Sequence, residues 1–226
     1  EEKLNSYLAC GINRISLGVQ SVDDIFLKKL GRIHNFEDVE RNIELARICG
    51  FENISADLIF GLPDQSLQHW QDSLACIQKY SLEHLSLYSL TIEDGTPFGR
   101  WAEEGKLSPS DEDLLADQYS HAISWLTQHG YEQYEISNWR RKEDKKDLAS
   151  KHNLQYWLNQ PYIGFGLGAH SCFKNKRIAN TPILSDYIYK LKKNGSASVI
   201  KMPASISVDE LSTMDEMKET MMLGLR

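Results

Sequence analysis

Three polar residues at or near the ends of predicted strands stand out for the chemistry they offer. Gln20 ends the apolar run Ile15–Gln20, Arg32 follows the turn-forming Gly31, and Asp57 lies inside another apolar run. Burying a carboxylate without partners costs several kcal/mol, so Asp57 is expected to bind an arginine, backbone donors or the paired hydroxyls of a ribose. The residue types alone leave both a structural ion pair and a ligand site open.

The elements that would position these side chains alternate between strand and helix. Apolar runs at 15–20 and 54–60 are typical of buried parallel strands, and an alternating pattern predicts a third strand over 84–90. Between the first two, a helix is predicted over 36–49, with Asn35 as its N-cap and Gly50 as its stop. The β-α-β order favours a parallel sheet with right-handed crossovers, and an α/β barrel keeps its site at the carboxyl ends of such strands.

The rest of the chain is predicted in less detail. Residues 91–109 are punctuated by glycine and proline and are predicted to form a long loop. Two further strands are expected over 131–139 and 162–173, and the basic cluster from Arg140 to Lys146 between them is expected to be a solvated loop. Helical patterns follow at about 185–193 and, rich in methionine, at 209–226.

Composition excludes several classes of function. The net charge of −7 argues against a nucleic-acid surface, which needs concentrated lysine and arginine. No apolar stretch approaches the roughly 18 residues of a membrane span, and no signal-peptide pattern is present, so a cytoplasmic location is expected. The four cysteines, at 10, 49, 76 and 172, are scattered, which disfavours a disulfide framework and a self-contained metal or iron–sulfur site.

Two other patterns imitate known sites. Gly164–Ala169 fits a loose dinucleotide-binding fingerprint, but no helical pattern follows it, so close approach of backbone is the better interpretation. The acidic residues Glu93, Asp94, Glu103 and Glu104 are interpreted as surface acids of a polar loop rather than as a general acid–base pair.

Several blocks in order resemble one known family. They are Gly11–Ser21, Leu30–His34, Asp57–Pro63, Leu85–Thr91 and Gly164–Ser171. Together they resemble the radical S-adenosylmethionine (SAM) family that contains oxygen-independent coproporphyrinogen III oxidase and a branch of heme chaperones. The resemblance covers about residues 1–195. It implies an α/β fold that is the second half of a (β/α) barrel of the radical SAM type.

The resemblance also implies a site. Gln20, Arg32 and Asp57 match positions that contact S-adenosylmethionine, where Gln20 and Asp57 can bind ribose hydroxyls and Arg32 can meet a carboxylate. Thr91 and His170 match further positions that line this site.

A second motif points to heme. His152-Asn153 followed by Tyr156-Trp157 matches the H-N-x-x-Y-W signature of the heme-chaperone branch, whose histidine is implicated in heme binding. Imidazole is a good axial ligand for iron, although a histidine beside an asparagine can also simply hold a loop. The motif favours a heme-binding chaperone that serves an acceptor protein the sequence does not identify. The alternative is the radical decarboxylation catalysed by coproporphyrinogen III oxidase.

The sequence departs from the family pattern in one respect. The C-x-x-x-C-x-x-C loop that holds the family's [4Fe-4S] cluster is absent, so the chain resembles a fragment and is expected to be inactive alone. The resemblance divides it into half of a barrel (1–110), a mixed α/β extension with the His152 and glycine motifs (111–195), and the start of a C-terminal helical domain (196–226).

Overall fold

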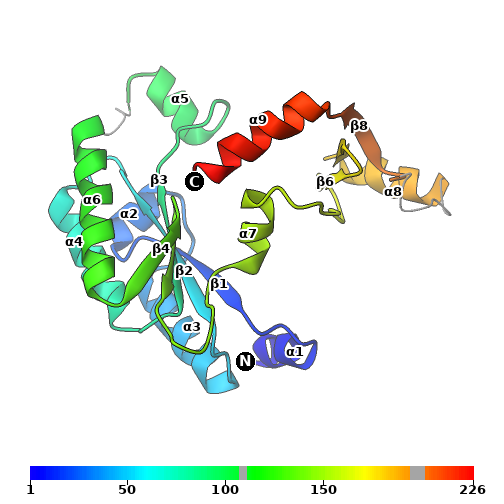
Figure 1. Cartoon of the computed structure of the whole chain (residues 1–226). Coiled ribbons are helices and arrows are strands. Elements are labelled where there is room, and N and C mark those ends of the chain that lie inside the picture. Colours follow the sequence, from blue (N-terminus) through cyan, green and yellow to red (C-terminus); the bar gives the residue numbers. More distant parts are fainter. Residues whose placement is uncertain (107–110, 194–201) are drawn as a thin grey trace. The chain divides into compact units, whose positions relative to one another are not determined.

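The computed structural model describes residues 1–106, 111–193 and 202–226, which form two compact units, 1–149 and 150–226 (Figure 1). The elements of the first unit are α1 (Glu2–Ala9), β1 (Ile15–Gln20), α2 (Asp24–Lys29), α3 (Phe36–Cys49), β2 (Ile54–Phe60), α4 (Leu67–Gln78), β3 (His84–Ser89), α5 (Pro97–Glu103), α6 (Glu112–Gln128), β4 (Tyr131–Glu135) and β5 (Asn138–Arg141).

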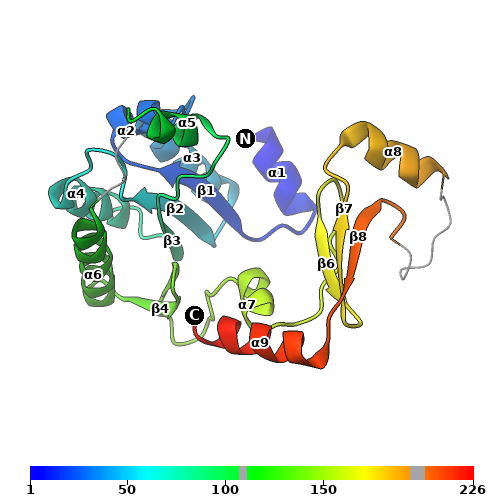
Figure 2. The same ribbon diagram turned by 90° about the horizontal axis from the view of Figure 1, so that it is seen from above.

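The first unit is built on a sheet with the strand order β1-β2-β3-β5-β4. The first three strands are parallel, as predicted, and lie side by side in Figure 2. Strands β5 and β4 continue the sheet in antiparallel fashion. Among the described residues the sheet is open, which confirms the α/β fold with an incomplete barrel.

One face of this sheet is apolar and is covered by helices. The row Leu17, Ala56, Leu85 and Trp139 crosses four strands on this face. Helices α3, α4 and α6 pack against it, with α4 and α6 also in contact with each other. Large side chains such as Trp70 are fully buried there, and each contributes about 1.5–3 kcal/mol.

The ends of α3 follow the predicted chemistry. The side chain of Asn35 accepts a hydrogen bond from the backbone N–H of Asp38 at 2.9 Å, and the Asp38 side chain bonds back to the Asn35 backbone. Gly50 stops the helix with a φ of +105°, a conformation that costs other residues energy.

Replacement of Asn35 by alanine removes the N-terminal cap of α3. We expect Asn35→Ala to lower the free energy of unfolding by about 1 kcal/mol, because the N–H group of Asp38 loses its partner. A urea titration measures this loss. Asn35→Ser, which keeps a capping oxygen, should be near wild type, and an equal loss in both variants would contradict the capping explanation.

Three sequence-based expectations are wrong in this unit. Residues 91–106 are not all loop, because Thr96 caps the short helix α5; residues 107–109, the end of the predicted loop, lie outside the described residues. The strand predicted over 131–139 is a hairpin, since the chain turns between Glu135 and Asn138. Arg140 and Arg141 belong to β5 and form ion pairs, instead of lying in a solvated loop.

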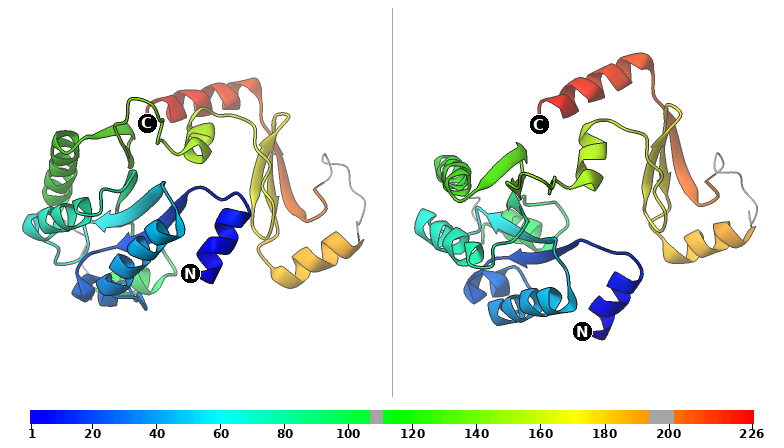
Figure 3. Two further views of the ribbon diagram at one scale, coloured as in Figure 1. Left: turned by 90° about the horizontal axis from the view of Figure 1, so that it is seen from below. Right: turned by 60° about the horizontal axis from the view of Figure 1, so that its bottom comes forward.

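The second unit contains α7 (Lys151–Trp157), β6 (His170–Phe173), β7 (Lys176–Asn180), α8 (Leu184–Lys193), β8 (Ser205–Glu210) and α9 (Thr213–Gly224). Its antiparallel sheet has the order β6-β7-β8, drawn in yellow to orange in Figure 3. The strand predicted over 162–173 is reduced to β6 and a single bridge between Tyr162 and Cys172. A Cβ on Gly164 would lie 2.1 Å from the carbonyl oxygen of His170, which confirms close backbone approach in this motif.

The boundary between the units, at residue 149, differs from the sequence-based divisions at 110 and 195. Helix α6 and strands β4 and β5 belong with the first unit because α6 contacts α4 and β2, and β5 pairs with β3. Within the described parts of the chain, no helix is long and apolar enough to cross a membrane.

Candidate functional site

The second face of the sheet in the first unit is polar. Because paired residues of neighbouring strands point to the same face, two polar rows run across it. One contains Gly18, Asp57, Ser86 and Asn138; the other contains Ser16, Ser55, His84 and Arg140. In a closed α/β barrel this face would be the interior.

Asp57 lies near the middle of this face. Its Oδ1 accepts a hydrogen bond from the Ser16 hydroxyl at 2.9 Å, and its neighbour in β3 is Ser86. Burial raises the pKa of the Asp57 carboxyl, while the hydroxyls of Ser16 and Ser86 and the charge of Arg14 act in the opposite direction. Asp57 therefore has polar neighbours but retains a carboxylate that is costly to ionise without a further donor.

Gln20 lies at the end of β1, on the same face of the sheet as this carboxylate. Its φ of +66° follows an irregularity in the pairing of β1 with β2. A Cβ on Gly18 would come within 2.8 Å of the Gln20 amide nitrogen, so the amide lies over Gly18. Gly18 is paired with Asp57, so the Gln20 amide and Asp57 lie on the same face of the sheet, and their shared role in a site stays a prediction.

Arg32 is placed differently. It follows α2, is exposed, and its backbone N–H bonds to the carbonyl of Leu27 at 3.0 Å. Within the described residues, no contact joins its guanidinium to Asp57 or Gln20, so its part in the site stays a prediction. Thr91 is exposed beyond β3, and His170 belongs to the second unit, at the start of β6.

A buried polar chain adjoins Asp57 and was not predicted. The Ser55 hydroxyl lies 2.8 Å from Nδ1 of His84, and the Tyr134 hydroxyl lies 2.7 Å from Nε2 of the same ring. Burial, helped by the charge of Arg14, lowers the pKa of His84 to about 3, so its imidazole is neutral at pH 7. The alternation of polar and apolar residues in β2 and β3 was a usable signal for these side chains, since it places them on the face of Asp57.

Arg14 interacts electrostatically both with Asp57 and with Tyr134 of the buried polar chain. Its Nη1 donates to the carbonyl of Leu148 at 3.0 Å, and its charge acts on both Asp57 and Tyr134. Burial lowers the pKa of Arg14, but arginine stays protonated throughout the physiological range. The polar face thus carries a fixed positive charge beside Asp57.

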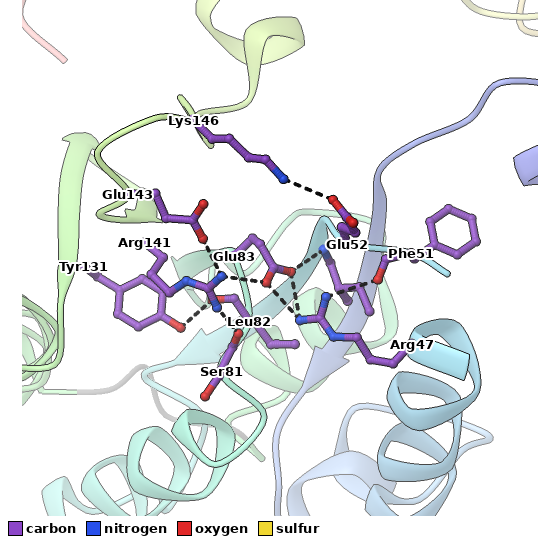
Figure 4. A network of polar contacts seen from close by, with 11 residues as sticks. Arg47, Phe51, Glu52, Ser81, Leu82, Glu83, Tyr131, Arg141, Glu143 and Lys146 are labelled. Carbon is purple, nitrogen blue, oxygen red and sulfur yellow. Dashed lines mark hydrogen bonds and ion pairs between the residues drawn. The ribbon is translucent and has the colours of Figure 1, made fainter. Parts of the chain in front are cut away.

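A separate ion-pair cluster lies where β2 and β3 begin (Figure 4). It is at the opposite end of these parallel strands from Gln20, which ends β1. Both Glu83 oxygens accept from Arg47, at 3.0 and 2.9 Å, and one also accepts from the Ile54 N–H at 2.9 Å. Arg141 lies 3.0 Å from the other oxygen. Both arginines are occupied by Glu83, so this cluster ties α3 and β5 to the start of β3 and has a structural role.

His152 lies on an exposed turn of α7 in the second unit. Its ring nitrogens lie 3.3 Å from the Tyr156 hydroxyl and 3.4 Å from the Gln155 amide nitrogen. The rings of His152 and Tyr156 meet edge to face, and Tyr156 meets Tyr162 in the same way at 4.6 Å. An exposed imidazole beside an aromatic ring, which itself packs on a second one, fits the requirements of a porphyrin iron.

The residues of this chain do not fit an iron–sulfur cluster. In the parts that the structure describes, no group of three His, Cys, Asp or Glu side chains could hold a metal ion. The cysteines are free and far apart in sequence.

Comparison with known proteins defines the class. The sequence profile of the radical SAM superfamily matches residues 1–77. The solved structure of coproporphyrinogen III oxidase (HemN) from Escherichia coli, a radical SAM enzyme, matches with a TM-score of 0.79 over 99% of this chain and 52% of that one. The sequence identity of 20% makes this a likeness of fold alone.

The curated relatives are more similar in sequence. The heme chaperone HemW of Bacillus subtilis is 40% identical over 225 residues, covering all of this chain and 56% of the relative. HemW of E. coli is 40% identical over 80% of this chain and 46% of its own length. The chain spans about half the length of the curated relatives it matches. It belongs to the radical SAM family of HemW- and HemN-like proteins.

Proposed function

We propose that this chain is part of a heme-binding chaperone and that His152 is the residue that contacts the iron. The exposed His152–Tyr156 pair on α7 carries this proposal, with support from the HemW relatives that match the whole chain. Heme is the cargo here, and its acceptor is a protein that remains to be identified. The oxidase alternative has weaker support, because the HemN structure is only 20% identical.

We also propose that the polar face of the first unit binds S-adenosylmethionine. Asp57 would accept hydrogen bonds from the ribose hydroxyls, with Gln20 beside it and Arg32 at the ligand's carboxylate. The placement of Gln20 over Gly18, next to Asp57, supports this assignment. When bound, a [4Fe-4S] cluster would supply the electron for SAM cleavage in this family. Its ligands are not among the residues of this chain, so we assign the chain no part in that step.

A heme titration followed by absorbance tests the chaperone proposal. We expect the Soret band to shift and saturate near one heme per chain, and His152→Ala to abolish the shift that arises from imidazole ligation. His129→Ala, which removes an exposed histidine of the first unit, is the matched control and should titrate like wild type. Equal shifts in all three proteins would refute the role of His152.

A further inference from the structure

The aromatic group around His152 continues into the sheet of the second unit. The ring of Tyr156 lies 5.1 Å from that of His152 and 4.6 Å from that of Tyr162, between centroids. Tyr162 is joined to Cys172 by two backbone hydrogen bonds, of 2.8 and 2.9 Å, and Cys172 is paired with Arg177 of β7. Paired residues of neighbouring strands point to the same face of a sheet. One row therefore leads from the proposed iron contact, past two aromatic rings, to a cation.

The guanidinium of Arg177 has donors to spare. Its Nη2 donates to the carboxylate of Glu219, in α9, at 2.8 Å. Its Nε is buried and has no hydrogen-bond partner among the described residues. A guanidinium carries five N–H donors, and Glu219 uses one of them, so donors remain for a second carboxylate. The Arg177 side chain is 40% exposed, which leaves it open to a ligand from solvent.

Heme offers two kinds of group that such a row can bind. Its flat porphyrin ring packs against aromatic side chains, and its two propionates are carboxylates at the edge of the ring. Arginine binds carboxylates through charge-assisted hydrogen bonds, which are stronger than neutral ones. The row has the aromatic rings beside the imidazole and the cation beyond them, in the order in which heme presents its iron, its ring and its propionates.

We propose that Arg177 binds a propionate of the heme whose iron His152 contacts, with Tyr156 and Tyr162 beside the porphyrin between these two ends. This inference rests on the proposed chaperone function and adds a second contact to the same cargo. The second unit then recognises both the metal and the charged edge of the porphyrin.

Two acids compete with the propionate for Arg177. Glu219 is bonded to it, and Asp209, its partner in β8, is exposed on the same face. Removal of the Glu219 charge should therefore strengthen heme binding, whereas removal of the Arg177 charge should weaken it. An ion pair with a structural role alone predicts the same direction for both changes, because either one breaks the pair.

Absorbance titrations with heme and with heme dimethyl ester, whose propionates carry no charge, test this contact in one detergent-containing buffer. Arg177→Gln should weaken the binding of heme about tenfold and leave that of the ester unchanged, because only heme offers a carboxylate. Equal weakening of heme and ester binding would overturn the proposal.

Lys176→Gln is the matched control for Arg177→Gln. Lys176 is the preceding residue of β7, has a side chain 43% exposed and is paired with Glu210 at 2.7 Å. Because side chains alternate along a strand, it points to the opposite face. Both ligands should bind this variant as they bind the wild type.

Glu219→Gln is the second test, with an effect of opposite sign. Glutamine keeps an oxygen that can accept from Arg177 but carries no charge, so heme should bind more tightly and the ester as before. Weaker or unchanged heme binding would contradict the proposal. The Soret shift reports the iron contact separately, since Arg177→Gln should keep this shift and His152→Ala should lose it. An unaffected shift in His152→Ala refutes the iron assignment alone, whereas failure to distinguish heme from its ester in Arg177→Gln refutes only the propionate contact.

Discussion

Glu83→Gln will lower the free energy of unfolding of the first unit by about 3 kcal/mol, as expected when one partner of a buried ion-pair group is removed. The Glu83 carboxylate is 4% exposed and is shared by Arg47, Arg141 and a backbone N–H (Figure 4). Glutamine is neutral, and its amide hydrogens face two guanidinium groups. Arg47 then keeps a partly buried charge without a carboxylate, and Arg141 keeps only its ion pair with Glu143. A urea titration followed by tryptophan fluorescence measures the loss.

Glu52→Gln is the matched control for this experiment. Glu52 forms an ion pair with Lys146 at 3.0 Å in the same region, but its side chain is 82% exposed. Exposed pairs of this kind contribute little, so its replacement should change stability by less than about 1 kcal/mol. Equal losses in the two variants would show that burial of Glu83 is not the source of the effect.

The parts of the fold that were predictable are those specified by neighbouring residues. Helix α3 was predictable because its capping residues, Asn35 and Gly50, adjoin its apolar pattern. Strands β1 and β2 were predictable from their apolar runs, and β3 from its alternation of apolar and polar residues. The β4–β5 hairpin was not, because residues 131–139 form one unbroken strand-like run. Its turn is fixed by Glu135, which bonds to the N–H of Ser137.

The site was predictable only in part for the same reason. Asp57 and Gln20 could be placed because each belongs to a recognisable strand, Asp57 inside β2 and Gln20 at the end of β1. The other polar residues of this face could not be identified, because they come from distant parts of the chain. Ser86 and Asn138, for example, are hydrogen-bonded but lie 52 residues apart in the sequence. Likewise, the basic residues of β5 looked solvated because Arg141 and its partner Glu83 are far apart in the chain. Only the pairing of β3 with β5 brings these groups together.

Asp57→Asn is expected to weaken S-adenosylmethionine binding while it stabilises the free chain. Loss of a charged acceptor for ribose hydroxyls should reduce the affinity about ten- to a hundredfold, measured by isothermal titration calorimetry. The introduced asparagine is neutral and keeps an oxygen that can accept the hydrogen bond from Ser16. Asp64→Asn, which changes an exposed aspartate paired with Lys29, is the control and should bind like wild type.

The pH dependence of stability distinguishes stabilisation through loss of the Asp57 charge from a general effect of the substitution. Burial raises the pKa of Asp57 in the folded state above its unfolded value. The stability linked to its proton is present below the unfolded pKa and is lost as pH rises through the folded pKa. At pH 7 the ionised Asp57 therefore opposes folding, and Asp57→Asn should have the higher urea midpoint. This advantage should vanish below about pH 4, where both states of the wild type are protonated. An advantage that persists at low pH would instead indicate better packing of the asparagine, and a lower midpoint at pH 7 would contradict the raised pKa.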